Sequence, residues 1–221
     1  YYSLGIAYAA SGQAESAIES YDEAVRNNPE YSEAYHNRGK VYHDIGQNGR
    51  AIEDYDLAIQ YNPEFFPAYN SRGIAYYESG ENWRAISDYS EAIRINPEYV
   101  AAYNNRGNAY LGVGEQGHAI EDYNEAVALD PENVAAYSNR GTAYRALGEN
   151  ERAIEYFDEV VRFHPDYAPV YNNRANSYYY LVQLEKALKA YDEAIRLDHS
   201  DPDIYINRGT VLFETSRFDR A

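Results

Sequence analysis

Hydrophobic positions along this chain follow the spacing of amphipathic helices. Tyr35 and Tyr42 lie seven positions apart on one helical stripe, and a second stripe, centred on Tyr55, follows after a short polar break. Small residues lie between the large ones on both stripes, as expected where two helices touch. The pattern predicts two helices, over about residues 34–45 and 49–62, that pack against each other through these stripes.

This helical pair recurs with a strict period of 34 residues. The segment AYHNRGKVY begins at residue 34, and similar segments begin at residues 68, 102, 136, 170 and 204. Prolines keep the same step, at Pro29, Pro63, Pro97, Pro131 and Pro165. A period of this length indicates stacked supersecondary units rather than one globular core. We therefore expect each unit to consist of a helix, a tight turn, a second helix and another turn.

Glycines mark the predicted tight turns. Because a left-handed residue often ends a helix, we expect the first helices to close at Gly12, Gly46, Gly80, Gly114 and Gly148. The sixth unit departs from the pattern in two places. Val182 replaces the capping glycine, and Ala175 replaces the glycine inside the first helix.

This pattern resembles the tetratricopeptide repeat. The motif residues of that family match Tyr35, Gly39, Tyr42, Ala51, Tyr55, Ala58 and Pro63 in order. The resemblance implies an all-α fold, a right-handed superhelical solenoid of stacked helix-turn-helix repeats, in a single array over residues 1–221. The expected repeats are 1–31 (partial), 32–65, 66–99, 100–133, 134–167, 168–201 and 202–221 (partial).

Composition and charge narrow the classes of function. The net charge of −17 repels phosphate backbones and anionic lipid, so we expect neither nucleic-acid binding nor membrane insertion. The same charge favours a basic partner. The chain has no Cys and no Met, which excludes disulfides and cysteine-based sites. Since it begins inside a repeat, we expect a fragment of a longer protein. The sequence does not identify the cellular compartment of the protein, and we expect the cytoplasm.

Asparagines recur at fixed positions of the first helix. In this family the first helices line the concave groove, so the stripe that contains Asn37 and Lys40 is the implied groove lining. One row comprises Asn37, Asn105, Asn139, Asn173 and Asn207; beside it lie Asn70, Asn104 and Asn172, and then Asn108 and Asn176. An amide both donates and accepts, so such a ladder can bind the main chain of an extended peptide. We expect a protein-interaction module that binds a peptide or partner segment there. The alternative is that the amides serve hydrogen bonding between repeats.

Two other functions stay open at this point. The repeat region of protein O-GlcNAc transferases carries a similar asparagine ladder, and the residues that match it are Asn37, Asn105, Asn139, Asn173 and Asn207. That resemblance implies the substrate-recognition region of a larger enzyme. A self-assembling scaffold is the other alternative, because neither end of the array looks capped and the ends could stack head to tail. The sequence shows no nucleophile with a positioned base and no phosphate loop, so we expect neither catalysis nor a cofactor here.

For the charged residues inside the repeat we expect a structural role, in ion pairs between helices. An arginine recurs beside the helix glycine, and Asp54, Asp88 and Asp122 recur on the adjoining helix. We expect Arg–Asp bridges in the second, third and fourth repeats, from Arg38, Arg72 and Arg106. His36 and His43 lie on the groove stripe without further metal ligands, and we expect them to be solvated or to contact a peptide.

Overall fold

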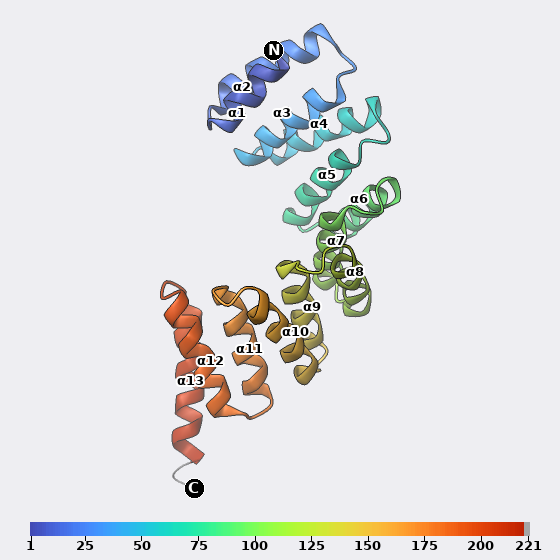
Figure 1. Cartoon of the computed structure of the whole chain (residues 1–221). Helices are drawn as coiled ribbons and strands as arrows, with labels where there is room; N and C mark the ends of the chain where they lie inside the picture. Colours follow the sequence, from blue (N-terminus) through green and yellow to red (C-terminus); the bar gives the residue numbers. More distant parts are fainter. Residues whose placement is uncertain (219–221) are drawn as a thin grey trace. The chain divides into compact units, whose positions relative to one another are not determined.

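The computed structural model describes residues 1–218 and contains thirteen helices and no strand in that range (Figure 1). The helices are α1 (Tyr2–Ala10), α2 (Ala14–Asn27), α3 (Ser32–Asp44), α4 (Asn48–Tyr61), α5 (Phe66–Glu78), α6 (Asn82–Ile95), α7 (Val100–Gly112), α8 (Gln116–Leu129), α9 (Val134–Ala146), α10 (Asn150–Phe163), α11 (Ala168–Tyr180), α12 (Leu184–Leu197) and α13 (Pro202–Phe218). This confirms the predicted all-α fold of helix-turn-helix repeats. The last three residues of the predicted seventh repeat lie outside the described range.

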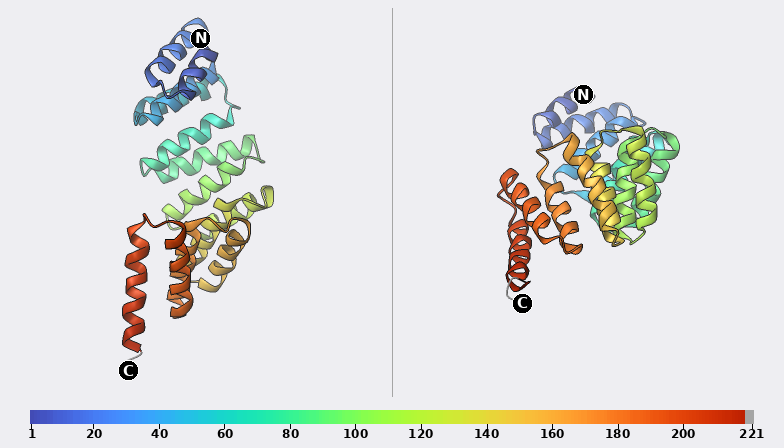
Figure 2. Two further views of the ribbon diagram at one scale, coloured as in Figure 1. Left: turned by 60° about the vertical axis from the view of Figure 1, so that its left-hand side comes forward. Right: turned by 60° about the horizontal axis from the view of Figure 1, so that its bottom comes forward.

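The chain forms two compact units, Tyr1–Val113 and Gly114–Ala221. In the first, the hairpins α1/α2, α3/α4 and α5/α6 pack in sequence and α7 packs on α6. In the second, α8 packs on α9, the hairpins α9/α10 and α11/α12 pack together, and α13 packs on α12. Figures 1 and 2 show this order of hairpins within each unit. The repeat boundaries and the single array over residues 1–221 stay predictions.

The predicted glycine caps are confirmed. All five capping glycines have positive φ, between 73° and 81°. At the end of α3, the N–H of Gly46 donates to the carbonyl of His43, and the N–H of Gln47 donates to that of Tyr42 (2.8 Å). These bonds satisfy carbonyls that the helix end leaves unpaired. Val182 adopts the same left-handed conformation with φ 58°, which is unfavourable for a β-branched residue.

In the hairpins α1/α2, α3/α4, α5/α6 and α9/α10, an aromatic ring packs against a glycine of the first helix. A Cβ atom added to Gly73 would lie 2.7 Å from the ring of Tyr89, and one added to Gly141 would lie 2.5 Å from the ring of Phe157. Real Cβ contacts are essentially never that short, so these hairpins have no room for a side chain at the glycine. The rings themselves are almost fully buried. The close approach therefore fixes the geometry of these helical pairs.

The helices of a repeat differ in their neighbours. First helices of successive repeats contact each other. In the first unit α1 contacts α3, α3 contacts α5 and α5 contacts α7, and in the second unit α9 contacts α11 and α11 contacts α13. Within either unit, the second helices of successive repeats make no such contact among the described residues. Within each unit, the first helices are therefore the more closely spaced set and form its inner face.

The predicted arginine bridges are present in the second and third repeats, with an additional partner. Arg38 binds Asp54 through Nε (2.8 Å) and Nη2 (2.6 Å), and its Nη1 binds Asp22 of the preceding repeat (2.5 Å). Arg72 binds Asp88 in the same two-pronged way. The bridge in the fourth repeat, from Arg106 to Asp122, stays a prediction.

Arginines of this row in the later repeats also have partners. Arg140 donates to Asn124 (2.8 Å) and lies 3.8 Å from the ring centroid of Tyr156. Arg174 and Arg208 bind Asp158 and Asp192 of the repeats before them. The row of arginines thus joins successive repeats as well as the two helices of one repeat.

Candidate functional site

The candidate site is the inner face of each unit. We define it as the surface of the first helices at the positions of His36, Asn37, Lys40, His43 and Asp44. The equivalent positions in the other repeats, offset by multiples of 34 residues, belong to it as well. In the first unit α1, α3, α5 and α7 contribute to it, and in the second α9, α11 and α13. All eleven predicted peptide-binding residues lie on these helices.

In the first unit the inner-face polar groups bond to each other across repeats. Asn37 Nδ2 donates to the hydroxyl of Tyr2 (2.8 Å), and Asn105 Nδ2 donates to Oδ1 of Asn70 (3.0 Å). Each bond joins residues 35 positions apart, on neighbouring first helices. Asn70 is buried by this contact, whereas Asn37 and Asn105 stay half-buried. Hydrogen bonding between repeats, one of the two interpretations of the ladder, therefore occurs here.

His36 takes part in the same row of contacts. Its Nε2 lies 2.9 Å from Ser71 Oγ, and its ring meets that of Phe65 edge-on at 5.2 Å between centroids. Burial, with a smaller effect from Lys40, lowers the pKa of His36 to about 4, so the ring is neutral at neutral pH. The expectation of a solvated or peptide-contacting His36 is therefore wrong, because the next repeat covers this side of the helix.

In the second unit two amides of the ladder have no such bond. Asn173 on α11 and Asn207 on α13 are half-buried, and their side chains make no hydrogen bond within the described part of the chain. Next to them, Oδ1 of Asn172 is buried without a donor. Asn176 accepts from the hydroxyl of Tyr191 (2.5 Å), which leaves its NH₂ group as a donor.

The other predicted residues are placed as follows. Asn104 is buried on α7, Asn108 is half-buried on the same helix, and Asn139 is half-buried on α9. Lys40 is exposed on α3. All these residues therefore lie on first helices, but neighbouring positions of one helix differ in how deeply the side chain is buried.

Hollows open on the inner face of both units. In the first, a hollow of about 360 Å³ is lined by Asn37, Lys40 and Asp44 together with apolar side chains of α1. In the second, a hollow of about 230 Å³ is lined by Arg145, Asn176, Tyr179, Tyr180, Tyr191, Asn207 and Thr210. The tyrosines of this second hollow are absent from the predicted site. The repeat frame could have indicated two of them, since Tyr179 and Tyr180 occupy the positions of His43 and Asp44.

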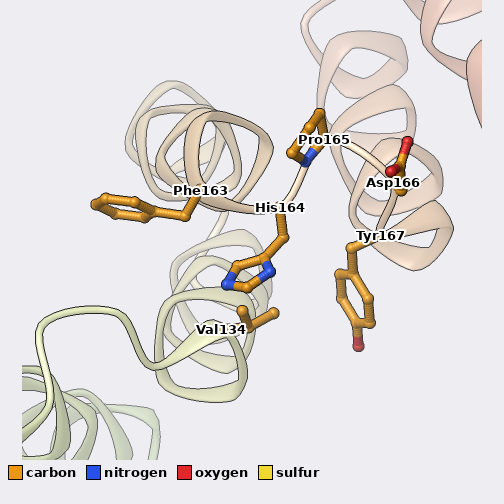
Figure 3. Close-up of a pocket in the computed structure, with 6 residues that line it drawn as sticks. All are labelled: Val134, Phe163, His164, Pro165, Asp166 and Tyr167. Carbon is orange, nitrogen blue, oxygen red and sulfur yellow. The ribbon is translucent and has the colours of Figure 1, made fainter.

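A further hollow, of about 440 Å³, lies at the loop between α10 and α11 (Figure 3). The ring of His164 is directed toward Val134, whereas the carboxylate of Asp166 points away from that ring. The polar groups of this hollow therefore do not converge, and we do not regard it as the candidate site. Within residues 1–218, no cluster of metal-ligating side chains occurs, and no helix has the length and apolarity needed to cross a membrane.

Two family models match the chain. One, described as "TPR repeat", matches residues 5–46, 39–80, 75–114 and 175–216, and another, described as "Tetratricopeptide repeat", matches residues 105–168. Together they cover well over half of the sequence. No curated protein matches the chain.

Several solved structures are similar. MamA is 29% identical, with a TM-score of 0.70, over 76% of this chain and 99% of that protein. YrrB, described as "a TPR protein with an unusual peptide-binding site", is 22% identical, with a TM-score of 0.70, over 87% of this chain and 99% of its own. A tetratricopeptide repeat protein from Parabacteroides merdae is 20% identical, with a TM-score of 0.81, over 98% of this chain and 86% of its own. The last two similarities establish the fold alone.

Proposed function

Because the chain belongs to the tetratricopeptide repeat family, whose members act in protein–protein interaction, we propose that its inner face binds an extended segment of a partner protein. The segment is held mainly through its main chain, by asparagine side chains of the first helices. The observation that carries this proposal is the pair of half-buried amides, Asn173 and Asn207, that make no hydrogen bond within the described chain.

Amides suit this task because each offers two donors and an acceptor, as a peptide unit offers one of each. Asn173 and Asn207 lie on α11 and α13, which contact each other, so one extended segment can cross both helices. Each hydrogen bond contributes only about 0.5–1.5 kcal/mol, and ordering the peptide offsets part of that. We therefore expect an affinity on the order of micromolar.

The amides of the first unit have a second role in this proposal. Asn37 and Asn105 each use one N–H group to join neighbouring repeats, which holds the side chain in one orientation. The rest of each half-buried amide still faces the inner surface. Lys40, Asn70, Asn104, Asn108, Asn139, Asn172 and Asn176 complete the proposed site. YrrB, a fold relative described by its peptide-binding site, supports a peptide as the ligand class.

The test uses a phage-displayed library of random dodecapeptides and two matched double variants. Changing Asn173 and Asn207 to Ala should abolish peptide selection while the unfolding midpoint in urea stays close to that of wild type, because no intrachain bond is lost. The control changes Asn37 and Asn105 to Ala and should lower the unfolding midpoint. Equal selection by wild type and the Asn173/Asn207 variant would refute main-chain binding at these amides.

Self-association is the second candidate, and an exposed apolar surface favours it. Ile206 on α13 is 65% exposed and Phe213 is 63% exposed, while Leu4 and Ile6 are exposed on α1. Exposed apolar residues that gather on one helix are a common feature of protein interfaces. Sedimentation at increasing concentration tests this: a mass that rises for wild type and not for Ile206→Lys supports self-association, and a constant mass excludes it. The substrate-recognition role in a larger enzyme stays a prediction.

A further inference from the structure

Neighbouring first helices repeat one polar contact on the inner face. His43 Nε2 on α3 lies 2.8 Å from Oε2 of Glu78 on α5. The hydroxyl of Tyr179 on α11 donates to Oε1 of Glu214 on α13 (3.0 Å). In both cases a donor on one helix meets a carboxylate 35 residues later, on the next first helix. In these two pairs the repeat geometry thus places a carboxylate against the donor position.

Arg145 on α9 occupies the same donor position, but the carboxylate is missing. The residue 35 positions later is Tyr180, whose side chain is 64% exposed. No carboxylate lies within ion-pair distance of Arg145 in the described part of the chain, and its Nε is buried without an acceptor. Within residues 1–218 this half-buried guanidinium is therefore unpaired, although the sequence is rich in carboxylates. A buried donor without an acceptor is costly, so this position favours an external acceptor.

The surroundings of Arg145 suit a carboxylate. Arg145 lines the hollow of about 230 Å³ in the second unit, and no acidic residue lines it. Since the Tyr191 hydroxyl already occupies Oδ1 of Asn176, the NH₂ group of that amide remains as a donor. Asn207 lines the same hollow and supplies a second amide. A guanidinium with flanking amide donors forms charge-assisted hydrogen bonds to a carboxylate, which are stronger than neutral ones.

We propose that the Arg145 hollow binds the carboxylate of an Asp or Glu side chain carried by the partner segment. The bound carboxylate takes the place that Glu78 occupies beside His43. This inference rests on the proposed function and adds to it a sequence requirement at one position. It differs from what the net charge of the chain suggests, since the overall charge favours a basic partner while this hollow favours an acidic residue.

The experiment compares peptide selection from the random dodecapeptide library by wild type, Arg145→Gln and Tyr180→Glu. Wild type should select peptides with Asp or Glu at one fixed position, and a Glu→Gln change in such a peptide should weaken binding about tenfold. Arg145→Gln should select peptides without that preference. Tyr180→Glu retains Arg145 but supplies an internal carboxylate, so it should lose the preference in the same way. Because Tyr180 is exposed, that variant should fold normally, which circular dichroism checks.

Each outcome has a separate meaning. Peptides selected by wild type without a fixed acidic residue would overturn this inference and leave the proposed function standing. No peptide selected by wild type would overturn both. Loss of affinity when the peptide's C-terminal carboxylate is amidated, with no effect of Glu→Gln, would assign the hollow to a chain terminus and overturn the side-chain proposal. A preference retained by Arg145→Gln would also overturn it.

Discussion

Removing Arg72 should strongly destabilise the first unit. The guanidinium binds both carboxylate oxygens of Asp88, at 2.8 and 2.7 Å, and the Asp88 residue is only 5% exposed. In Arg72→Met the Asp88 charge would stay buried without its partner. Breaking a buried pair in this way costs about 3–5 kcal/mol of unfolding free energy. Replacing both partners with Met should recover most of that loss, because an apolar pair of similar volume is often as stable.

The loss should depend on pH in a definite direction. Burial raises the pKa of Asp88 above its usual value, and the bonds to Arg72 oppose this rise. Without Arg72 the pKa of Asp88 rises further, so the folded variant takes up a proton at a higher pH than the unfolded chain does. Protonation then favours folding, and the difference from wild type should shrink between about pH 7 and about pH 4.5.

The assay is urea unfolding followed by circular dichroism and by fluorescence of Trp83. This is the only tryptophan of the chain, and it lies on α6, the helix that carries Asp88. Asp56→Asn is the matched control: its carboxylate also binds Arg72 (2.5 Å) but is 54% exposed, so its loss should cost less than about 1 kcal/mol. A cost below about 1 kcal/mol for Arg72→Met, unchanged by pH, would refute the buried-pair argument.

Three further changes test separate parts of the account. Val182→Gly should raise the unfolding free energy by about 1–2 kcal/mol in urea titration, since glycine adopts the positive φ without strain; no gain would contradict the strain. Wild-type stability should fall by up to roughly 3 kcal/mol as pH drops from 6.5 to about 4, because the lowered pKa of His36 disfavours proton uptake by the folded chain. His36→Asn should reduce this fall, and an identical pH profile would exclude His36 as its source. Gly141→Ala should lower the melting temperature, because the added Cβ would overlap the ring of Phe157.

Much of the fold follows from the period and from backbone requirements. A glycine in left-handed conformation at position 46, and a glycine under an aromatic ring at position 73, are local demands that leave a direct trace in the sequence. Even the unusual conformation of Val182 could be predicted, because the 34-residue frame places it at a capping position.

The partners of polar side chains could be predicted only in part. The sequence predicts that Arg72 binds Asp88 of its own repeat, but the second partner, Asp56, belongs to the repeat before it. Likewise, the sequence places the positions of Asn104 and Asn105 on one stripe of the first helix, yet Asn104 is buried and Asn105 is half-buried. Such differences depend on how closely neighbouring repeats approach, which the periodic pattern does not specify.

The most direct test of main-chain binding on the inner face is NMR of the asparagine side-chain NH₂ groups during titration with a selected peptide. We expect saturable shifts of the Asn173 and Asn207 signals, with smaller shifts at Asn37. The same peptide with N-methylated backbone amides should bind more weakly and cause smaller shifts, because its main chain can still accept hydrogen bonds but can no longer donate them. Shifts confined to residues of the second helices, or equal shifts with the methylated peptide, would contradict the account.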